Sequence, residues 1–223
     1  LQVLQLQFSF YCTISTFADD QGGDAAGIVE AVGPDVTRFQ PGDRVFADLF
    51  SHGQGAFAEF VCARERAFLR VPDGVSLEDA ATLPHSAVLA VQGLRLGQRT
   101  IGPGDRLLIL GASGNVGPFA VQLAKQAGAE VTGTARTSKL DFARSLGLDR
   151  VIDHSTTDAL AERDRYDWIL DVDGHAGLRQ ARRALRPGGV YLTLGGSGRR
   201  IVGAMVLGPL LSRRSGGRHV GLM

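Results

Sequence analysis

The hydrophobic and polar positions of the chain follow two different patterns, which change near residue 76. Before this point, short β-rich runs are separated by Gly-Pro and Pro-Gly-Asp turns. The runs are Gly27–Val32, Arg44–Ala47 and Ala56–Val61. We therefore predict a small, barrel-like β domain in this part of the chain.

A helical pattern starts after Ser76. Apolar residues recur at helical spacing from Leu77 to Leu96, and Ser76 is suited to cap the helix. Glu78 and Asp79 fall in the first turn, where the helix dipole favours acids. We expect this helix to lead from one domain to the next.

Strand and helix patterns alternate regularly beyond Gly104, which is typical of a parallel sheet covered by helices. The predicted strands are Arg106–Leu110, Glu130–Thr134, Arg150–Asp153, Trp168–Val172, Val190–Leu194 and His219–Leu222. Predicted helices between them include Pro118–Ala127, Lys139–Leu146 and Ala176–Leu185. The expected fold class is α/β, with six strands in a doubly wound sheet of the Rossmann type.

The strongest chemical motif joins the first of these strands to a helix. Leu107–Gly117 reads as a buried strand, a turn of small residues and the start of a helix. Such a turn brings backbone amides close to a pyrophosphate, and the helix dipole stabilises the anion. Our candidate contacts are the turn residues and one glycine of the second strand: Ser113, Gly114, Asn115, Val116 and Gly133. The alternative is a plain strand-to-helix turn, which does not require this spacing of small residues.

The end of the second strand predicts which dinucleotide binds. An acid there would accept hydrogen bonds from a ribose 2′-hydroxyl, but no acid lies between Val131 and Lys139. Arg136 and Lys139 are suited to neutralise a 2′-phosphate instead. We therefore expect NADPH as the cofactor; the alternative is that both cations are solvated surface residues.

Composition adds few constraints. The 223 residues carry a formal net charge of +1 with interspersed signs, so we expect no nucleic-acid partner and no membrane partner. No apolar run is long enough for a spanning helix, and Leu1–Phe17 lacks the basic leader of a signal peptide. Two cysteines, Cys12 and Cys62, favour a reducing, cytoplasmic location. The missing initiator Met and the final strand suggest that both ends are cut.

The order of motifs from Gly23 onward resembles one superfamily. Its matching segments are Asp24–Gly33, Pro41–Val45, Gly55–Phe60, Ala80–Pro84, Gly111–Gly117 and Arg186–Val190. Together they resemble the medium-chain dehydrogenase/reductases, specifically the zinc-free quinone oxidoreductase branch. The resemblance implies an unassigned start at 1–21, a partial GroES-like catalytic domain at 22–85 and an NAD(P)-binding Rossmann domain at 86–223.

The same resemblance suggests further site residues. Gly195, Gly196 and Ser197 would sit beside the nicotinamide, and His154 matches a cofactor-contacting Tyr or His; His154 is equally compatible with a plain surface position. Zinc-using relatives have a His-Glu pair directly after the glycine, whereas Gly23 is followed here by Asp24, and their cysteine string is absent. We expect no metal, since a catalytic zinc normally needs three protein ligands.

The expected function is transfer of hydride from NADPH to a small-molecule quinone, enone or similar activated carbonyl acceptor. We assign no catalytic residue, because Leu1–Gln21 does not match the family and Leu89 stands where relatives often have Thr. One alternative is an enoyl-reductase module of a polyketide synthase. Another is a nucleotide-binding pseudoenzyme or an inactive fragment. Relatives often form dimers, so a homodimer is a further hypothesis.

Overall fold

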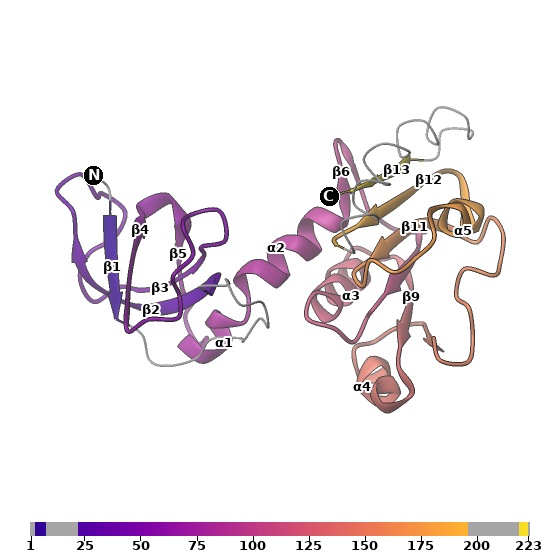
Figure 1. The fold of residues 1–223 in the computed structure, drawn as a ribbon, viewed down its shortest axis with the longest axis horizontal. Helices are drawn as coiled ribbons and strands as arrows, with labels where there is room; N and C mark the ends of the chain where they lie inside the picture. Colours follow the sequence, from indigo (N-terminus) through magenta and orange to yellow (C-terminus); the bar gives the residue numbers. More distant parts are fainter. Residues whose placement is uncertain (1–2, 8–21, 196–218, 223) are drawn as a thin grey trace. The chain divides into compact units, whose positions relative to one another are not determined.

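The computed structural model describes residues 3–7, 22–195 and 219–222. The chain forms two compact units, Leu1–Val88 and Leu89–Met223, which are described separately below (Figure 1). The division lies three residues beyond the domain boundary expected after residue 85.

Unit 1 contains a five-stranded sheet in the order β4-β1-β2-β3-β5, with every neighbouring pair antiparallel. Its strands are β1 (Val3–Gln7), β2 (Asp24–Val32), β3 (Arg44–Asp48), β4 (Phe60–Arg64) and β5 (Phe68–Arg70). The predicted strand Ala56–Val61 is wrong in its bounds, because residues 56–59 form no strand and the chain before them bends at Gln54 and Gly55, with φ values of 58° and 93°. Ala56 then donates its N–H to the carbonyl of Gly22, and strand β4 begins only at Phe60.

The inward positions of unit 1 alternate along its strands, as expected for a sheet with one covered face. Val29, Val45, Leu49 and Phe68 form the centre of its core and are almost completely buried. A short 3-10 helix, η1 (Glu65–Ala67), separates β4 from β5.

The predicted helix at Leu77–Leu96 is two helices, α1 (Leu77–Ala81) and α2 (Pro84–Gly93). The Ser76 cap is confirmed, because its Oγ accepts the N–H of Asp79 at 3.0 Å. Pro84 explains the break, since a proline has no N–H to donate and disfavours helical backbone in the residue before it.

Unit 2 is built on a six-stranded parallel sheet in the order β10-β9-β8-β11-β12-β13. The strands are β8 (Arg106–Leu110), β9 (Glu130–Ala135), β10 (Arg150–Asp153), β11 (Tyr166–Asp171), β12 (Leu185–Thr193) and β13 (His219–Leu222). The first strand lies at the centre, and the order reverses between β8 and β11. This is the doubly wound arrangement that the sequence predicts, and it is confirmed.

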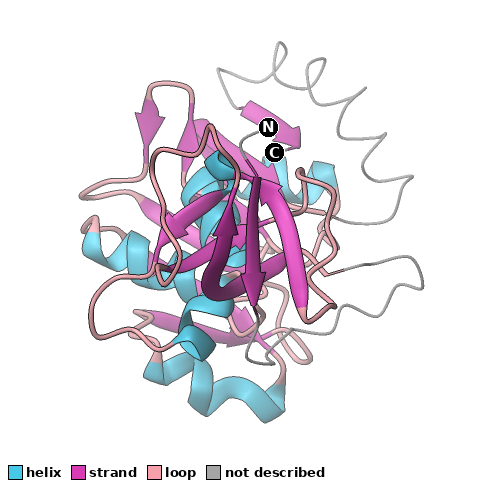
Figure 2. Ribbon diagram, turned by 90° about the vertical axis from the view of Figure 1, so that its left-hand side faces the viewer, coloured by secondary structure: helices cyan, strands magenta, loops and turns pink. Residues whose placement is uncertain are grey.

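Both faces of this sheet are covered. Leu107 packs in one cluster with Ala120 of helix α3, whereas Leu108 packs in another with Ala181 of helix α5. Alternate residues of a strand face opposite sides, so the continuous apolar run Leu107–Leu110 of β8 needs a helix on each side of the sheet. The helices of unit 2 after β8 are α3 (Gly117–Gln126), η2 (Thr137–Lys139), α4 (Leu140–Ser145) and α5 (Leu178–Ala184). Figure 1 labels α3, α4 and α5, and Figure 2 draws helices in cyan and strands in magenta.

A small two-stranded ribbon, β6 (Arg95–Leu96) with β7 (Arg99–Thr100), precedes the sheet and has no counterpart among the predicted strands. Over the described part of the chain, every helix is too short or too polar to span a bilayer.

Candidate functional site

The glycine-rich turn of unit 2 is fastened to the neighbouring strand. Gly111 follows β8 in a left-handed conformation, with φ of 85°. Its N–H donates to Thr134 Oγ1 at 3.0 Å, and the next N–H, of Ala112, donates to the Thr134 carbonyl at 2.9 Å. A single buried threonine of β9 therefore holds the first half of the turn in place.

The glycines of this turn serve different purposes. A Cβ on Gly117 would lie 2.4 Å from the carbonyl oxygen of Ala112, so helix α3 can start here only with glycine. A Cβ on Gly133 of β9 would lie 2.7 Å from that of Ala112, so this buried glycine makes room for the turn. Gly114 is exposed, and a Cβ there would meet only the Gly111 carbonyl, at 3.3 Å. Its small size leaves the outer side of the turn open.

The N-terminus of α3 faces this open side without a capping side chain. Val116 occupies the cap position and makes no side-chain hydrogen bond, while Gly114 and Asn115 are exposed. Amides in the first turn of a helix have no partner within the helix, and the dipole adds a partial positive charge. A turn of this kind is suited to bind an anion.

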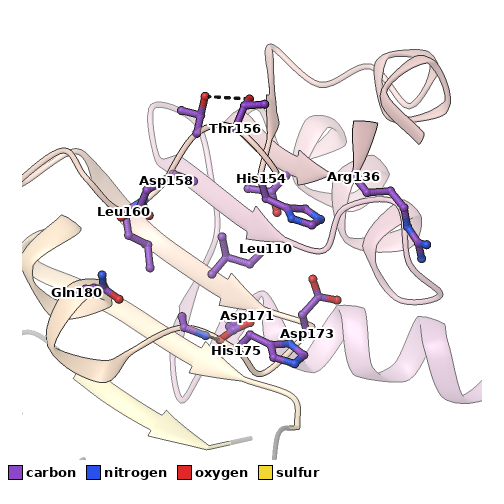
Figure 3. Close-up of a pocket in the computed structure, with 14 residues that line it drawn as sticks. Leu110, Arg136, His154, Thr156, Asp158, Leu160, Asp171, Asp173, His175 and Gln180 are labelled. Atoms are coloured by element: carbon purple, nitrogen blue, oxygen red, sulfur yellow. Dashed lines mark hydrogen bonds between the residues drawn. The ribbon is translucent and has the colours of Figure 1, made fainter. Parts of the chain in front are cut away.

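A cavity of about 870 Å³ lies at the carboxyl ends of the parallel strands (Figure 3). Its lining comes from the ends of β8, β9, β10 and β11 and from the segments that follow them. Ligands of doubly wound sheets bind in this position, beside the reversal of strand order. The lining residues used below are Leu110, Arg136, His154, Asp171, Asp173 and His175.

Asp171 orders the segment after β11. The side chain is fully buried, and its carboxylate accepts N–H groups from Gly174 at 2.8 Å and Ala176 at 3.0 Å. It also accepts the hydroxyl of Tyr191 at 2.9 Å. Three donors offset the cost of burying the charge and hold residues 172–176 in one conformation.

Asp173, in this ordered segment, lies against the glycine-rich turn. Its Oδ1 and Oδ2 are 2.5 Å and 2.9 Å from the position of a Cβ on Gly111. The residue is exposed and lines the cavity together with His175 (Figure 3). An acid therefore stands beside the turn, although the second strand provides none.

Asp153 ties the segment after β10 to the one after β9. Its carboxylate accepts the Thr137 hydroxyl at 2.6 Å and the Ser155 N–H at 2.8 Å, and these bonds, the threonine first, hold its pKa below the ordinary value. The neighbouring residue His154 and the residue before Thr137, Arg136, line the same cavity.

Comparisons with known proteins agree with this architecture. Residues 8–73 match the family model described as an alcohol dehydrogenase GroES-like domain, and residues 115–216 match that of a zinc-binding dehydrogenase. Erythronolide synthase EryA2 of Saccharopolyspora erythraea is 48% identical over 136 residues, which are 58% of this chain and 4% of the synthase. The chloroplast envelope quinone oxidoreductase homolog of Arabidopsis thaliana is 41% identical over 155 residues, 66% of this chain and 47% of that protein.

The solved structure of the quinone oxidoreductase from Coxiella burnetii superposes with a TM-score of 0.82 at 25% identity, covering 100% of this chain and 74% of that one. The chain belongs to the medium-chain dehydrogenase/reductase superfamily, in its quinone oxidoreductase-like branch. It spans about half the length of the plant relative and a small part of the synthase.

Two of the eleven predicted cofactor contacts line this cavity, and the role of all eleven stays a prediction. Arg136 and His154 both line the cavity, and the guanidinium of Arg136 points away from its centre (Figure 3). Lys139 donates from Nζ to the carbonyl of Ser113 at 3.2 Å, which places its ammonium group beside the turn. Gly195 accepts the Thr193 hydroxyl at 2.9 Å and does not line the cavity.

The other predicted nicotinamide contacts, Gly196 and Ser197, lie outside the described residues. Gly133 is buried under the turn and away from the cavity lining. Its described role is packing, so any effect on a cofactor would be indirect.

The expected absence of a metal stays a prediction. Within residues 3–7, 22–195 and 219–222, no three His, Cys, Asp or Glu side chains gather as a metal site. Cys62 is an exposed thiol on β4, and Cys12 lies outside the described residues.

Sequence reasoning missed one polar cluster, in unit 1. The His85 ring approaches Asp48, with Nδ1 3.1 Å from Oδ2, and the His85 backbone N–H donates to Asp24 Oδ1 at 2.9 Å. Phe50 stacks on the imidazole with ring centroids 5.0 Å apart. Burial raises the pKa of Asp24 above its ordinary value. These residues come from three separate segments, and no motif links them in the sequence.

Proposed function

We propose that this chain is the cofactor-binding part of an NADPH-dependent, zinc-independent oxidoreductase that reduces a quinone, an enone or a similar activated carbonyl compound. The observation that carries the proposal is the open glycine-rich turn at the start of α3, with Lys139 bonded to its Ser113 carbonyl; Arg136 lines the cavity at the carboxyl ends of the strands. Relatives named as quinone oxidoreductases support an oxidoreductase of this kind.

The residues of the turn fit a dinucleotide. The Gly114 N–H donates to the Gly111 carbonyl at 3.0 Å, so the amides that follow it at the start of α3 would hold the diphosphate, where the missing Cβ of Gly114 permits a close approach. Arg136 and Lys139 would neutralise a 2′-phosphate, and the bond from Lys139 to Ser113 couples this cation to the turn. NADPH, when bound, supplies hydride. The chain's own residues bind and orient it.

A second candidate is an enoyl reductase acting within a polyketide synthase. The identity of 48% to a segment of EryA2 favours it. The two candidates share the cofactor and differ in the acceptor: a free quinone in one case, and an enoyl thioester on a carrier in the other.

The test of the cofactor assignment is calorimetric titration with NADPH and NADH. We expect at least about tenfold tighter binding of NADPH, because a charge-assisted contact to phosphate is worth roughly 1.5 to 3 kcal/mol. Arg136→Ala combined with Lys139→Ala should remove most of the preference, and higher salt should weaken it. Equal affinities in the parent, or an unchanged ratio in the double variant, would refute the role of these cations.

The single variants separate two contributions. Arg136→Ala removes a cation of the cavity lining, whereas Lys139→Ala also removes the bond to the Ser113 carbonyl. Arg144→Ala is the matched control, since Arg144 is an exposed cation of α4 that pairs with Asp141 at 2.6 Å. The control should leave both affinities unchanged.

Activity and metal content test the remaining parts of the proposal. Turnover of NADPH with a quinone, compared with an enoyl thioester, distinguishes the two acceptor classes. Cofactor binding without turnover of either acceptor would favour the pseudoenzyme alternative. One equivalent of zinc in the purified protein would contradict the zinc-independent assignment.

A further inference from the structure

Asp173 places a carboxylate beside the glycine-rich turn. This is unexpected, because a carboxylate would repel an anion bound at the turn. Its carboxylate oxygens lie 2.5 Å and 2.9 Å from the site of a Cβ on Gly111, the first residue of the turn. The side chain lines the same cavity as Arg136 and His154 (Figure 3). Among the described residues, no hydrogen bond or ion pair occupies this carboxylate.

The position of Asp173 is imposed by its neighbours. Buried Asp171 binds the N–H groups of Gly174 and Ala176, and these bonds fix the backbone on both sides of Asp173. Gly111 lacks the Cβ that would otherwise occupy the space taken by the carboxylate. The fold therefore holds a charged acceptor at the cavity without using it for its own structure.

An acid near a diphosphate weakens binding unless it has a donor on the same ligand. A dinucleotide carries such donors on its ribose rings. In doubly wound folds an acid that accepts a ribose hydroxyl usually follows the second strand. In this chain the residues after β9 are Arg136 and Thr137, and the acid stands instead after β11.

We propose that Asp173 accepts a hydrogen bond from a hydroxyl of the adenosine ribose. The proposal rests on the proposed function and names a residue that determines specificity within the same site. Arg136 and Lys139 then bind the 2′-phosphate, and Asp173 reads a free hydroxyl of the same sugar. The site selects a nucleotide that carries both groups.

The experiment uses ADP and 2′,3′-dideoxy-ADP, so that its readout is binding and not turnover. For the parent protein we expect ADP to bind about tenfold more tightly than its dideoxy analogue, because the analogue lacks both hydroxyl donors. Asp173→Ala should weaken ADP binding about tenfold and leave the affinity for 2′,3′-dideoxy-ADP within about twofold. Calorimetry supplies both constants, and circular dichroism shows whether the variant is folded.

Glu130→Ala is the matched control. Glu130 is also an exposed acid of unit 2, but it begins β9, lies outside the cavity lining and pairs with Arg165 at 3.2 Å. This variant should bind both ligands as the parent does. Asp173→Asn, which keeps the shape and loses the charge, should fall between the parent and Asp173→Ala with ADP.

Three results would overturn the role of Asp173. The first is ADP binding that is unchanged in Asp173→Ala, and the second is an equal change for both ligands. The third is tighter binding of both ligands, which would show that the acid only repels the diphosphate. Failure of the parent to bind NADPH, NADH and ADP would instead overturn the proposed function and this inference with it, whereas normal NADPH binding with any of the three results overturns the inference alone.

Discussion

Both units have acids near the ends of strands, but the carboxylates differ in the hydrogen-bond donors and charges around them. In unit 2, Asp171 is fully buried and receives three donors, and the glycine-rich turn beside it has no room for added atoms at Gly117. In unit 1, the half-buried Asp24 receives the N–H of His85 and stands near the like charge of Asp48. Unit 2 thus has a site with closely fixed geometry, whereas unit 1 keeps a carboxyl group whose charge is partly uncompensated.

The largest expected effects on stability and nucleotide binding concern two glycines of the turn in unit 2. Gly117→Val should destabilise unit 2 by about 3 kcal/mol or more, since its Cβ would collide with backbone that the fold cannot move cheaply. Gly114→Val should leave the unfolding transition nearly unchanged and abolish nucleotide binding, because the position is exposed. Thermal unfolding and NADPH titration measure the two effects.

The fluorescence of Trp168 provides a probe specific to unit 2, because the chain contains one tryptophan and it is fully buried there. A stable Gly117→Val protein would show that the helix start is more adaptable than the contact implies. Retained NADPH affinity in folded Gly114→Val would remove the argument for a diphosphate at the turn.

The sequence predicted the parallel sheet well because its signals are local. A buried apolar run, a turn of small residues and an amphipathic helix are all contiguous, and five of the six strands were predicted within two residues of their observed bounds. The exception is β12, which begins at Leu185, five residues before the predicted start at Val190. Arg136 and His154 follow predicted strands and line the cavity, while their contact with a cofactor stays a prediction. The division at Pro84 was missed because the apolar spacing continues across it, although the proline itself was a usable signal.

The missed site residues depend on contacts between distant segments. Asp173 meets Gly111 only after β11 pairs with β8, and His85 meets Asp24 and Asp48 only when unit 1 has folded. Asp171, near the end of the predicted strand Trp168–Val172, was visible in the sequence as an acid. Its importance was not visible, because its burial and its hydrogen-bond donors are properties of the fold.

The buried carboxylate of unit 2 gives the second largest expected effect. Asp171→Ala should lower the free energy of unfolding by about 2 to 3 kcal/mol, because the donors of Gly174, Ala176 and Tyr191 lose a charged acceptor. Tyr191→Phe removes only one donor and should cost about 1 kcal/mol. Urea unfolding followed by Trp168 fluorescence measures both. A smaller loss for Asp171→Ala than for Tyr191→Phe would contradict the assigned role of the carboxylate.

A third, smaller effect concerns Asp149 of unit 2. The ion pair with Lys125, at 2.6 Å, and the N–H of Val131 hold the Asp149 pKa below its ordinary value of 3.8. A lowered pKa stabilises the fold above the unfolded-state value, and the contribution is lost as the pH falls through the folded-state value. Asp149→Asn should therefore cost up to about 1 kcal/mol at neutral pH, because the pair is partly exposed and screened.

The measurement is the difference in unfolding free energy between the parent and Asp149→Asn at several pH values. This difference should shrink as the pH drops below 3.8, where the parent also loses the charge. A difference independent of pH would mean that the ion pair does not contribute and that only the shape of the side chain matters.

Asp24 of unit 1 should respond to pH in the opposite direction. Burial, the largest cause, raises its pKa above 3.8, with the Coulombic repulsion of Asp48 adding to the rise and the His85 N–H and imidazole opposing it. A raised carboxyl pKa favours folding when the group is protonated, so this contribution is present below the unfolded-state pKa and is lost as the pH rises through the folded-state value.

Asp24→Asn keeps an oxygen that accepts the His85 N–H and removes the charge, so above this window the variant should be slightly more stable than the parent, by less than about 1 kcal/mol. Hydrogen exchange of the β2 and β3 amides reports on unit 1 alone, and Asp73→Asn, at an exposed turn position of the same unit, is the control. Loss of protection in Asp24→Asn at neutral pH would show that the ionised carboxylate stabilises unit 1, and the contrast between the two units would then fail.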